Sequence, residues 1–301
     1  MASYDVIVIG EGVSGLTAAG ALARAGARVA TLEGQLFGGL IINVNELEPG
    51  PEGSPASGAE LASEIMQANA EAGVASLQEE VTAIRAGNTG IQVVAAGGTH
   101  TARDVVVATG ARLKKLGVPG EAEYEGRGVS QCADCDGPMY QNEDVLVVGG
   151  GDSALQEALV LSRYCRRVHL VHRGTAFSGA AHFADQVGAN DKISVIWKAS
   201  VDAILGSKMV EKVRLKHSDG RIEELACAGV FAYIGLEPST GFLPPEIERD
   251  ERGYIRTTDT FETKLPHVWA IGAVRSGYAG VLDAAIAEGR RVAETLKQRL
   301  E

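Results

Sequence analysis

A glycine-rich loop between an apolar strand and a helix constrains the fold of this chain more than any other feature. The loop, Gly10-x-Gly12-x-x-Gly15, follows the β-branched run of residues 4–9 and precedes an alanine-rich segment. Glycines at this spacing let backbone amides approach a pyrophosphate at the N-terminus of the following helix. Glu33 ends the next predicted strand, where its carboxylate can accept a hydrogen bond from a ribose hydroxyl. The pattern predicts a dinucleotide-binding unit, and the acid favours FAD or NAD over NADP.

The same context occurs a second time further along the chain. Residues 144–148 form an apolar strand pattern, and Gly149 to Ala154 follow it with the related form G-x-G-x-x-A. The next predicted strand ends in His172 and Arg173 rather than in an acid. A cation in this place suits a 2′-phosphate, as in NADP. The second loop therefore predicts a second nucleotide site.

Two segments that resemble linkers separate these units, residues 111–120 and the proline-containing residues 236–245. The chain crosses twice, so we predict that the second unit is inserted into the first. The predicted fold class is α/β, with two doubly wound, Rossmann-like, three-layer domains. The predicted domains are residues 1–113 plus 243–301, and residues 114–242.

Outside the two loops, alternating and apolar runs predict further elements. Strands near residues 193–197, 201–205, 210–217 and 221–226 are expected to form a meander. Residues 253–258 and 267–272 are predicted to be short strands. A terminal helix is expected over about residues 281–299, where apolar residues recur at helical spacing.

Composition and charge narrow the class of function. The 301 residues carry 28 basic and 39 acidic side chains, a net charge of −11, which argues against general nucleic-acid binding. No apolar run approaches the roughly 20 residues of a membrane span. The N-terminus runs directly into a strand, so we expect no signal peptide. Only 4 cysteines and no disulfide framework suit a reducing compartment, which predicts a cytoplasmic location.

Two of the cysteines, Cys132 and Cys135, are separated by two residues, and Asp136 follows directly. Thiols at this spacing can close a small disulfide, and one of them is often acidified so that it attacks as the thiolate. A zinc site needs about four ligands, whereas Cys165 and Cys227 are isolated in the sequence. We therefore favour a redox pair and predict no metal site, with half of a zinc site or a purely structural pair as the alternatives.

Taken together, the order of motifs resembles the low-molecular-weight thioredoxin reductases over nearly the whole chain. The matching features are Gly10-x-Gly12-x-x-Gly15 with Glu33, Ala108-Thr109-Gly110, Cys132-Ala133-Asp134-Cys135-Asp136, Gly149 to Ala154, and Phe231-x-Tyr233-Ile234-Gly235-x-x-Pro238. Cysteines just before the second nucleotide loop are specific to this group. The larger glutathione-reductase-like enzymes carry them in the FAD domain and add a dimerisation domain for which this chain has no room.

The resemblance implies a FAD-dependent thiol-disulfide oxidoreductase that passes electrons to thioredoxin or a related disulfide substrate. It implies FAD on the first domain, NADPH on the second, a homodimer, and a domain rotation that presents the cysteines alternately to flavin and to substrate. Carried over to this chain, Cys135 faces the flavin, Cys132 attacks the substrate disulfide, and Asp136 is the general acid. A helix N-terminal cap is the alternative role for Asp136.

The predicted cofactor-binding residues fall into two sets. In the first unit they are Gly10, Gly12, Ser14, Gly15, Glu33, Gly39, Leu40, Asn45, Val81, Thr109, Gly110, Gly272, Ala273 and Tyr278. In the second unit they are Gly149, Gly151, Asp152, Ser153, Ala154, His172, Arg173, Ile234 and Gly235.

The chain departs from the family pattern at several cofactor contacts. Of the family's His-Arg-Arg and a further Arg four residues on, only Arg173 remains, with Gly174 and Ser178 in the other places. The family's Gly-Asp near the C-terminus is Gly272-Ala273, and its Gly-Gly-Gln is Gly38-Gly39-Leu40.

These departures indicate an altered electron donor. NADPH or NADH stays open beside a pyridine-nucleotide-independent version fed by ferredoxin or by a second flavin, on which Tyr278 would stack. A dithiol oxidase acting on a small molecule and a flavoprotein redox sensor are further alternatives.

Overall fold

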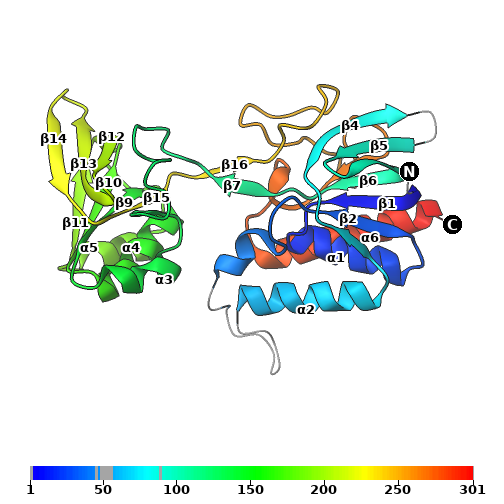
Figure 1. The fold of residues 1–301 in the computed structure, drawn as a ribbon, viewed down its shortest axis with the longest axis horizontal. Helices are drawn as coiled ribbons and strands as arrows, with labels where there is room; N and C mark the ends of the chain where they lie inside the picture. Colours follow the sequence, from blue (N-terminus) through cyan, green and yellow to red (C-terminus); the bar gives the residue numbers. More distant parts are fainter. Residues whose placement is uncertain (1–2, 45–46, 48–56, 88–89, 301) are drawn as a thin grey trace. The chain divides into compact units, whose positions relative to one another are not determined.

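The computed structural model describes residues 3–44, 47, 57–87 and 90–300. It divides the chain into two compact units, Met1–Arg112 with Glu237–Glu301, and Leu113–Leu236 (Figure 1). The two crossings, β7 (Ala111–Leu113) and β16 (Leu236–Pro238), pair with each other. The sequence placed the return between residues 242 and 243, whereas Phe242 already packs against the core of the first unit.

A seven-stranded sheet forms the centre of the first unit, in the order β3-β2-β1-β6-β5-β4, with β17 paired to β6. Its strands are β1 (Ser3–Ile9), β2 (Val29–Leu32), β3 (Ala75–Leu77), β4 (Val81–Gly87), β5 (Gly90–Ala95), β6 (Gly98–Val107) and β17 (Val268–Ala270). Strands β3, β2, β1, β6 and β17 run parallel, whereas β4 and β5 pair antiparallel beside the first half of β6.

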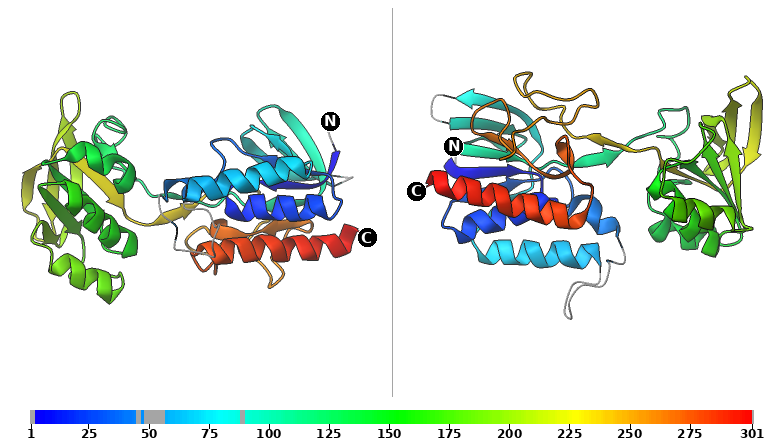
Figure 2. Two further views of the ribbon diagram at one scale, coloured as in Figure 1. Left: turned by 90° about the horizontal axis from the view of Figure 1, so that it is seen from below. Right: turned by 180° about the vertical axis from the view of Figure 1, so that it is seen from behind.

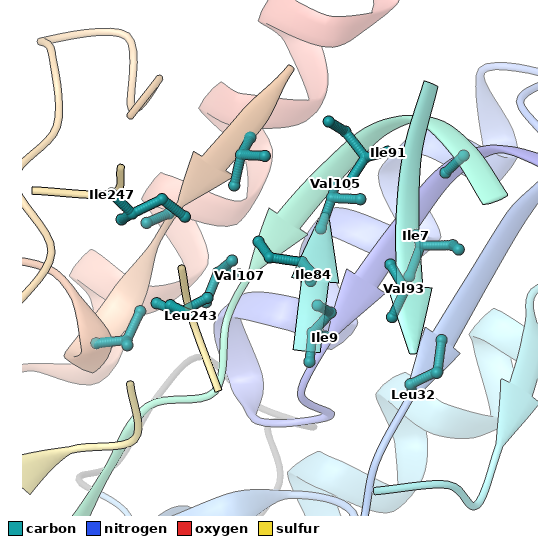
Figure 3. Packing of buried hydrophobic residues seen from close by; sticks show 14 of the residues in the cluster. Ile7, Ile9, Leu32, Ile84, Ile91, Val93, Val105, Val107, Leu243 and Ile247 are labelled. Atoms are coloured by element: carbon teal, nitrogen blue, oxygen red, sulfur yellow. The ribbon is translucent and has the colours of Figure 1, made fainter. Parts of the chain in front are cut away.

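Helices cover one face of the parallel strands, and side chains of β4 and β5, which extend the sheet from the first half of β6, pack on the other face. Helices α2 (Gly58–Glu71), α1 (Val13–Arg24) and α6 (Leu282–Leu300) lie side by side (Figure 2). Strand β1 alternates between the faces: Val6 and Val8 share a core with α1 and α6. On the opposite face, Ile7 and Ile9 pack with Val93 of β5 and with Leu243 (Figure 3). The alternation follows from the two-residue period of a strand.

The second unit repeats this three-layer plan around a five-stranded parallel sheet in the order β11-β10-β9-β15-β8. Its strands are β8 (Val129–Ser130), β9 (Asp144–Gly149), β10 (Arg167–His172), β11 (Ile193–Trp197) and β15 (Gly229–Tyr233). Helices α3 (Ala133–Asp136), α4 (Asp152–Tyr164) and α5 (Ala181–Gly188) pack on one face, and β12 (Ala199–Gly206), β13 (Val210–His217) and β14 (Ile222–Ala226) form an antiparallel meander on the other.

These layers confirm the predicted α/β class with two Rossmann-like units. The described residues also form short 3-10 helices, namely η1 (Gly39–Asn43), η2 (Gly137–Tyr140) and η3 (Gly272–Val274). Within the described ranges, no helix combines the length and apolar character needed to cross a bilayer.

Two sequence predictions about strands were wrong. Residues 193–197 form β11, which pairs parallel with β10 and lies outside the meander. A parallel neighbour requires a crossover connection, and α5, which the sequence analysis did not predict, supplies it. Residues 253–258 form no strand; Ile255 makes isolated bridges to Arg249 and Arg275 instead.

Candidate active site

The predicted redox pair is a closed disulfide. Cys132 and Cys135 are bonded with their Cα atoms 5.3 Å apart. Cys132 is the N-cap of α3, which places the two sulfurs one helical turn apart on one face. Its Sγ accepts a hydrogen bond of 3.2 Å from the Cys135 amide, while its own amide donates to Ser130 Oγ at 3.1 Å. Cys135 is exposed and Cys132 is half-buried, so the disulfide is accessible from the surface of its unit.

Asp136 is the last residue of α3 and is half-buried. The N-cap of α3 is Cys132, so Asp136 does not cap the helix that carries the cysteines. Asp136 occupies the N-cap position of η2, but its side chain makes no capping hydrogen bond there. The structure therefore shows no side-chain cap by Asp136, and the general-acid role stays a prediction.

A buried tyrosine and a half-buried acid pack beneath α3. Tyr233, at the end of β15, accepts a hydrogen bond from the Ala133 amide at 3.1 Å. Glu157 of α4 interacts with the same amide and with the Tyr233 side chain, and its Oε2 is buried without a partner among the described residues. Burial and then the charge of Asp134 raise the pKa of Glu157 to about 7. Burial, followed by the charge of Glu157, likewise raises the pKa of Tyr233.

The sequence analysis did not identify Glu157 as a site residue. A signal was available, because Glu157 lies three residues after Ala154 and four before Leu161, both of which are buried. An acid at this spacing falls on the apolar face of the helix.

We predict that Glu157→Gln stabilises the protein in a pH-dependent way. Between pH 4.5 and about 7 the folded protein keeps a proton that the unfolded chain loses, so wild-type stability falls as the pH rises through this window. Glutamine does not ionise, so the variant does not lose this stability as the pH rises. A pKa shift corresponds to at most about 1.36 kcal/mol per unit, and the Glu157 side chain keeps some solvent contact, so we expect a smaller gain of about 1–2 kcal/mol at pH 8. Thermal unfolding at pH 8 and pH 4.5 measures it; a gain of equal size at both pH values would contradict the buried-acid interpretation.

The first glycine loop has the backbone that a pyrophosphate site requires. Gly10 has a φ of +104°, and a Cβ there would lie 2.5 Å from the Ala108 oxygen. A Cβ at Gly15 would lie 2.1 Å from the Gly10 oxygen, so neither position accepts a side chain. Nothing lies within 4 Å of a Cβ built at Gly12. The side of Gly12 on which a Cβ would stand is therefore open at the start of α1, which leaves room for the pyrophosphate of a dinucleotide.

Several predicted residues from distant segments meet at this loop. A Cβ at Gly272 would lie 2.4 Å from Ser14 Oγ, and one at Gly39 would lie 3.4 Å from the Gly12 Cα. Gly39 of η1 and Gly272 of η3 therefore lie beside the N-terminus of α1. They lie at the carboxyl end of the parallel strands, the usual position of a ligand in such sheets.

Other predicted residues of the first unit are placed less tightly. Thr109 follows β6 and donates to the Ser239 oxygen at 2.8 Å, and Gly110 beside it has a φ of +62°. Leu40 is exposed, Val81 begins β4 and packs against the sheet core, and Tyr278 donates to the Val281 oxygen at 2.8 Å. Asn45 lies outside the described residues.

Glu33 is held by the backbone at the end of β2. Its carboxylate accepts from the Glu11 amide at 3.0 Å and from the Gln35 amide at 2.9 Å. Glu11, which the sequence analysis did not identify, is buried and accepts from the hydroxyls of Thr31 and Ser76. The two acids fix the shape of the loop and orient the Glu33 carboxylate at the place where a ribose would bind.

Next to Ala273, where the family has an acid, a different acid enters from α6. Glu288 is buried and accepts from the Gly272 amide at 2.7 Å. Arg275 forms an ion pair with it through two nitrogens and also lies over the Phe261 ring. The sequence analysis did not predict this pair, because Arg275 and Glu288 are brought together only when α6 packs against η3.

The second glycine loop is placed at the start of α4, as predicted. A Cβ at Gly149 would lie 2.3 Å from the Tyr233 oxygen, so this position requires glycine. Gly151 is the N-cap of α4, Asp152 and Ser153 begin the helix, and Ala154 is buried. His172 and Arg173 follow at the end of β10, with Arg173 exposed. Ile234 and Gly235 leave β15, where the Gly235 oxygen accepts from the Lys114 amide.

The remaining cysteines are buried and separate from the redox pair. Burial raises the pKa of Cys165 to about 11 and that of Cys227 to about 12, so both stay protonated thiols at neutral pH. We predict that the reduced, native protein shows two fast-reacting thiols with an aromatic disulfide reagent. All 4 cysteines should react only after denaturation. A third fast thiol in the native protein would contradict this assignment.

Comparison with known proteins places the chain in a family. Residues 4–289 match the family described as pyridine nucleotide-disulphide oxidoreductase. The chain therefore belongs to this family of disulfide oxidoreductases. Within it, the relatives and solved structures below confirm the resemblance to the low-molecular-weight thioredoxin reductases.

Curated relatives and solved structures match nearly the whole chain. It is 40% identical to a thioredoxin reductase of Treponema pallidum (strain Nichols), over 91% of this chain and 89% of the relative. It is 36% identical to one from Listeria innocua, over 99% of this chain and 96% of the relative. The crystal structure of Lactococcus lactis thioredoxin reductase in the FR conformation aligns with a TM-score of 0.89 at 33% identity, over 98% of both chains. These relatives do not favour the dithiol oxidase or the ferredoxin-fed and second-flavin versions.

Proposed function

We propose that this protein is a FAD-dependent thiol-disulfide oxidoreductase of thioredoxin reductase type. It passes electrons through the Cys132–Cys135 pair to thioredoxin or a related protein disulfide. The accessible disulfide on α3, beside the half-buried Asp136, is the observation that carries this proposal. The open loop around Gly12 supports FAD in the first unit. Bound FAD, once reduced, would supply the two electrons that open the disulfide.

The chemistry of the reduced pair is a double thiol-disulfide exchange. The Cys132 thiolate attacks one sulfur of the substrate disulfide, so a mixed disulfide forms and the first substrate thiolate leaves. The Cys135 thiolate then attacks Cys132 Sγ, which releases the second substrate thiolate and restores the internal disulfide. Two protein thiols are oxidised and one substrate disulfide is reduced. The protons of the two protein thiols pass to the two leaving thiolates, and Asp136 carries one of them.

Two features of the structure support these roles, one at the cysteine pair and one in the first unit. The Cys135 amide points at Cys132 Sγ, and a hydrogen-bond donor at 3.2 Å stabilises negative charge on that sulfur. In the first unit, the amides at the start of α1 would hold the FAD pyrophosphate and Glu33 the ribose. Following the family, Cys135 is the thiol that faces the flavin.

The test reduces the bound flavin with light and then adds an oxidised thioredoxin under anaerobic conditions. We expect the flavin absorbance to return as thioredoxin thiols appear, with one thioredoxin disulfide reduced per two electrons. This design needs no added nucleotide, so it tests the disulfide chemistry alone. A reduced flavin that persists in the presence of oxidised thioredoxin would refute the proposed function.

A homodimer and a cytoplasmic location complete the proposal. The homodimer rests on the resemblance to the thioredoxin reductases. The cytoplasmic location rests on the scarcity of cysteines in a protein that uses a thiol pair.

A further inference from the structure

The second glycine loop is covered by the chain's own residues 175–180, here called the covering segment. The Gly150 oxygen accepts hydrogen bonds from the amides of Ser178 at 2.8 Å and Gly179 at 3.1 Å, and from Ser178 Oγ at 3.1 Å. The Ala180 amide donates to Asp152 Oδ1 at 2.6 Å. These contacts join the covering segment to the loop and to the first residue of α4.

The covering segment lies over the Asp152 amide, one of those that a pyrophosphate would use at the start of α4. A Cβ built at Gly179 would be 3.0 Å from the Asp152 nitrogen and 3.0 Å from the Gly151 carbonyl carbon. The Gly179 backbone therefore packs directly on the first turn of α4. At the counterpart of Gly12, a Cβ on Gly151 would lie 3.9 Å from Ser178 Oγ, whereas a Cβ on Gly12 has nothing within 4 Å.

His172 fills the crevice on the other side of the loop. A Cβ at Gly150 would lie 2.3 Å from its Nδ1, and one at Gly174 would lie 2.8 Å from its Nε2. The imidazole is thus enclosed between the two glycines, and its ring packs edge-on against Trp197 at a centroid distance of 5.9 Å. Phe177 of the covering segment packs against Trp197 with the rings tilted and their centroids 4.5 Å apart.

Charge at the loop also opposes an anionic ligand. Asp152, predicted from the sequence to contact the nucleotide, instead directs its carboxylate to the Ala180 amide at the start of α4, where its negative charge disfavours a phosphate. Of the cations expected for a 2′-phosphate, only the exposed Arg173 is present, with Gly174 and Ser178 in the other places. The residues present therefore do not fit a bound pyridine nucleotide.

From this disagreement we propose that the covering segment determines donor specificity by keeping NADPH and NADH off the second glycine loop. A dinucleotide binds only if the segment gives up its hydrogen bonds to Gly150 and Asp152. This inference rests on the proposed function, since it concerns how the flavin of the same enzyme receives electrons. It concerns only the second unit and leaves the disulfide chemistry unchanged.

The test measures binding of NADPH and NADH to the FAD-loaded protein by calorimetry, and bleaching of the flavin by each nucleotide without oxygen. Gly179→Ala is the opening variant, because its new methyl group would meet the backbone of Gly151 and Asp152. Gly188→Ala is the matched control, since a Cβ there has nothing within 4 Å. Asp152→Ala, which removes the tether to Ala180 and the negative charge, serves as a second opening variant if Gly179→Ala fails to fold.

We expect millimolar or weaker binding and no bleaching within a minute for the wild type and Gly188→Ala. An opening variant should bind at least tenfold more tightly. Micromolar binding or bleaching within seconds by the wild type would overturn the inference, and so would equally weak binding by every variant.

Thioredoxin reduction by the light-reduced protein is measured as a separate assay. Its failure would refute the proposed function, whereas tight nucleotide binding with thioredoxin reduction intact would refute this inference alone.

Discussion

Replacing either Cys132 or Cys135 with serine is expected to lower the rate of thioredoxin-disulfide reduction by at least about 1,000-fold, because groups that act as one catalytic unit fail together. Cys132→Ser removes the attacking thiolate, and Cys135→Ser removes the thiol that resolves the mixed disulfide. The internal disulfide cannot re-form in either variant. The measurement is the reoxidation rate of the light-reduced flavin after oxidised thioredoxin is added.

Cys165→Ala is the matched control for this pair. Cys165 is fully buried in the helix-side core of the second unit, and burial raises its pKa to about 11. We expect this variant to keep most of the wild-type rate while losing some stability to a small cavity. A Cys132→Ser protein with more than a tenth of the wild-type rate would show that the reaction bypasses the pair.

The second large effect is expected at the buried ion pair beside η3. Removing one partner of a buried pair leaves an uncompensated charge and typically costs about 3–5 kcal/mol. Glu288→Ala leaves Arg275 in this state and also removes the acceptor of the Gly272 amide. We therefore expect a large fall in the thermal stability of the first unit, together with loss of FAD during purification.

Two further variants separate the buried charge from general effects of the substitution. Glu248→Ala breaks the exposed pair with Lys264 and should cost less than about 1 kcal/mol. Arg275→Met combined with Glu288→Leu removes both charges and should recover part of the stability that Glu288→Ala loses. Equal losses in Glu288→Ala and Glu248→Ala would show that the buried pair has no special role.

Features fixed by local sequence were predictable. The two glycine loops depend on glycines at set spacings between a strand and a helix, and the structure places Gly10 and Gly149 where only glycine is accepted. The cysteines form a disulfide because a helical turn brings residues three apart together. The antiparallel strands 210–217 and 221–226 were recognised from alternation, since one face of the meander is buried.

Features that depend on distant partners were not predictable. Strand β11 has the same apolar character as a meander strand, and only its pairing with β10 across α5 distinguishes it. Glu288 looks like an ordinary helix-surface acid until η3 packs against it. The second glycine loop matches its motif, yet whether it is open depends on the path of residues 175–180, which no local pattern encodes.

The central claim is that Cys132 attacks the substrate disulfide and Cys135 resolves the product. Cys135→Ser should therefore trap a covalent complex with thioredoxin when the reduced variant is mixed with the oxidised substrate. Peptide mapping by mass spectrometry locates the link. The account predicts a disulfide between Cys132 and one thioredoxin cysteine, released by added dithiol. A link formed through Cys135 in the Cys132→Ser protein, with none through Cys132 in the Cys135→Ser protein, would contradict it.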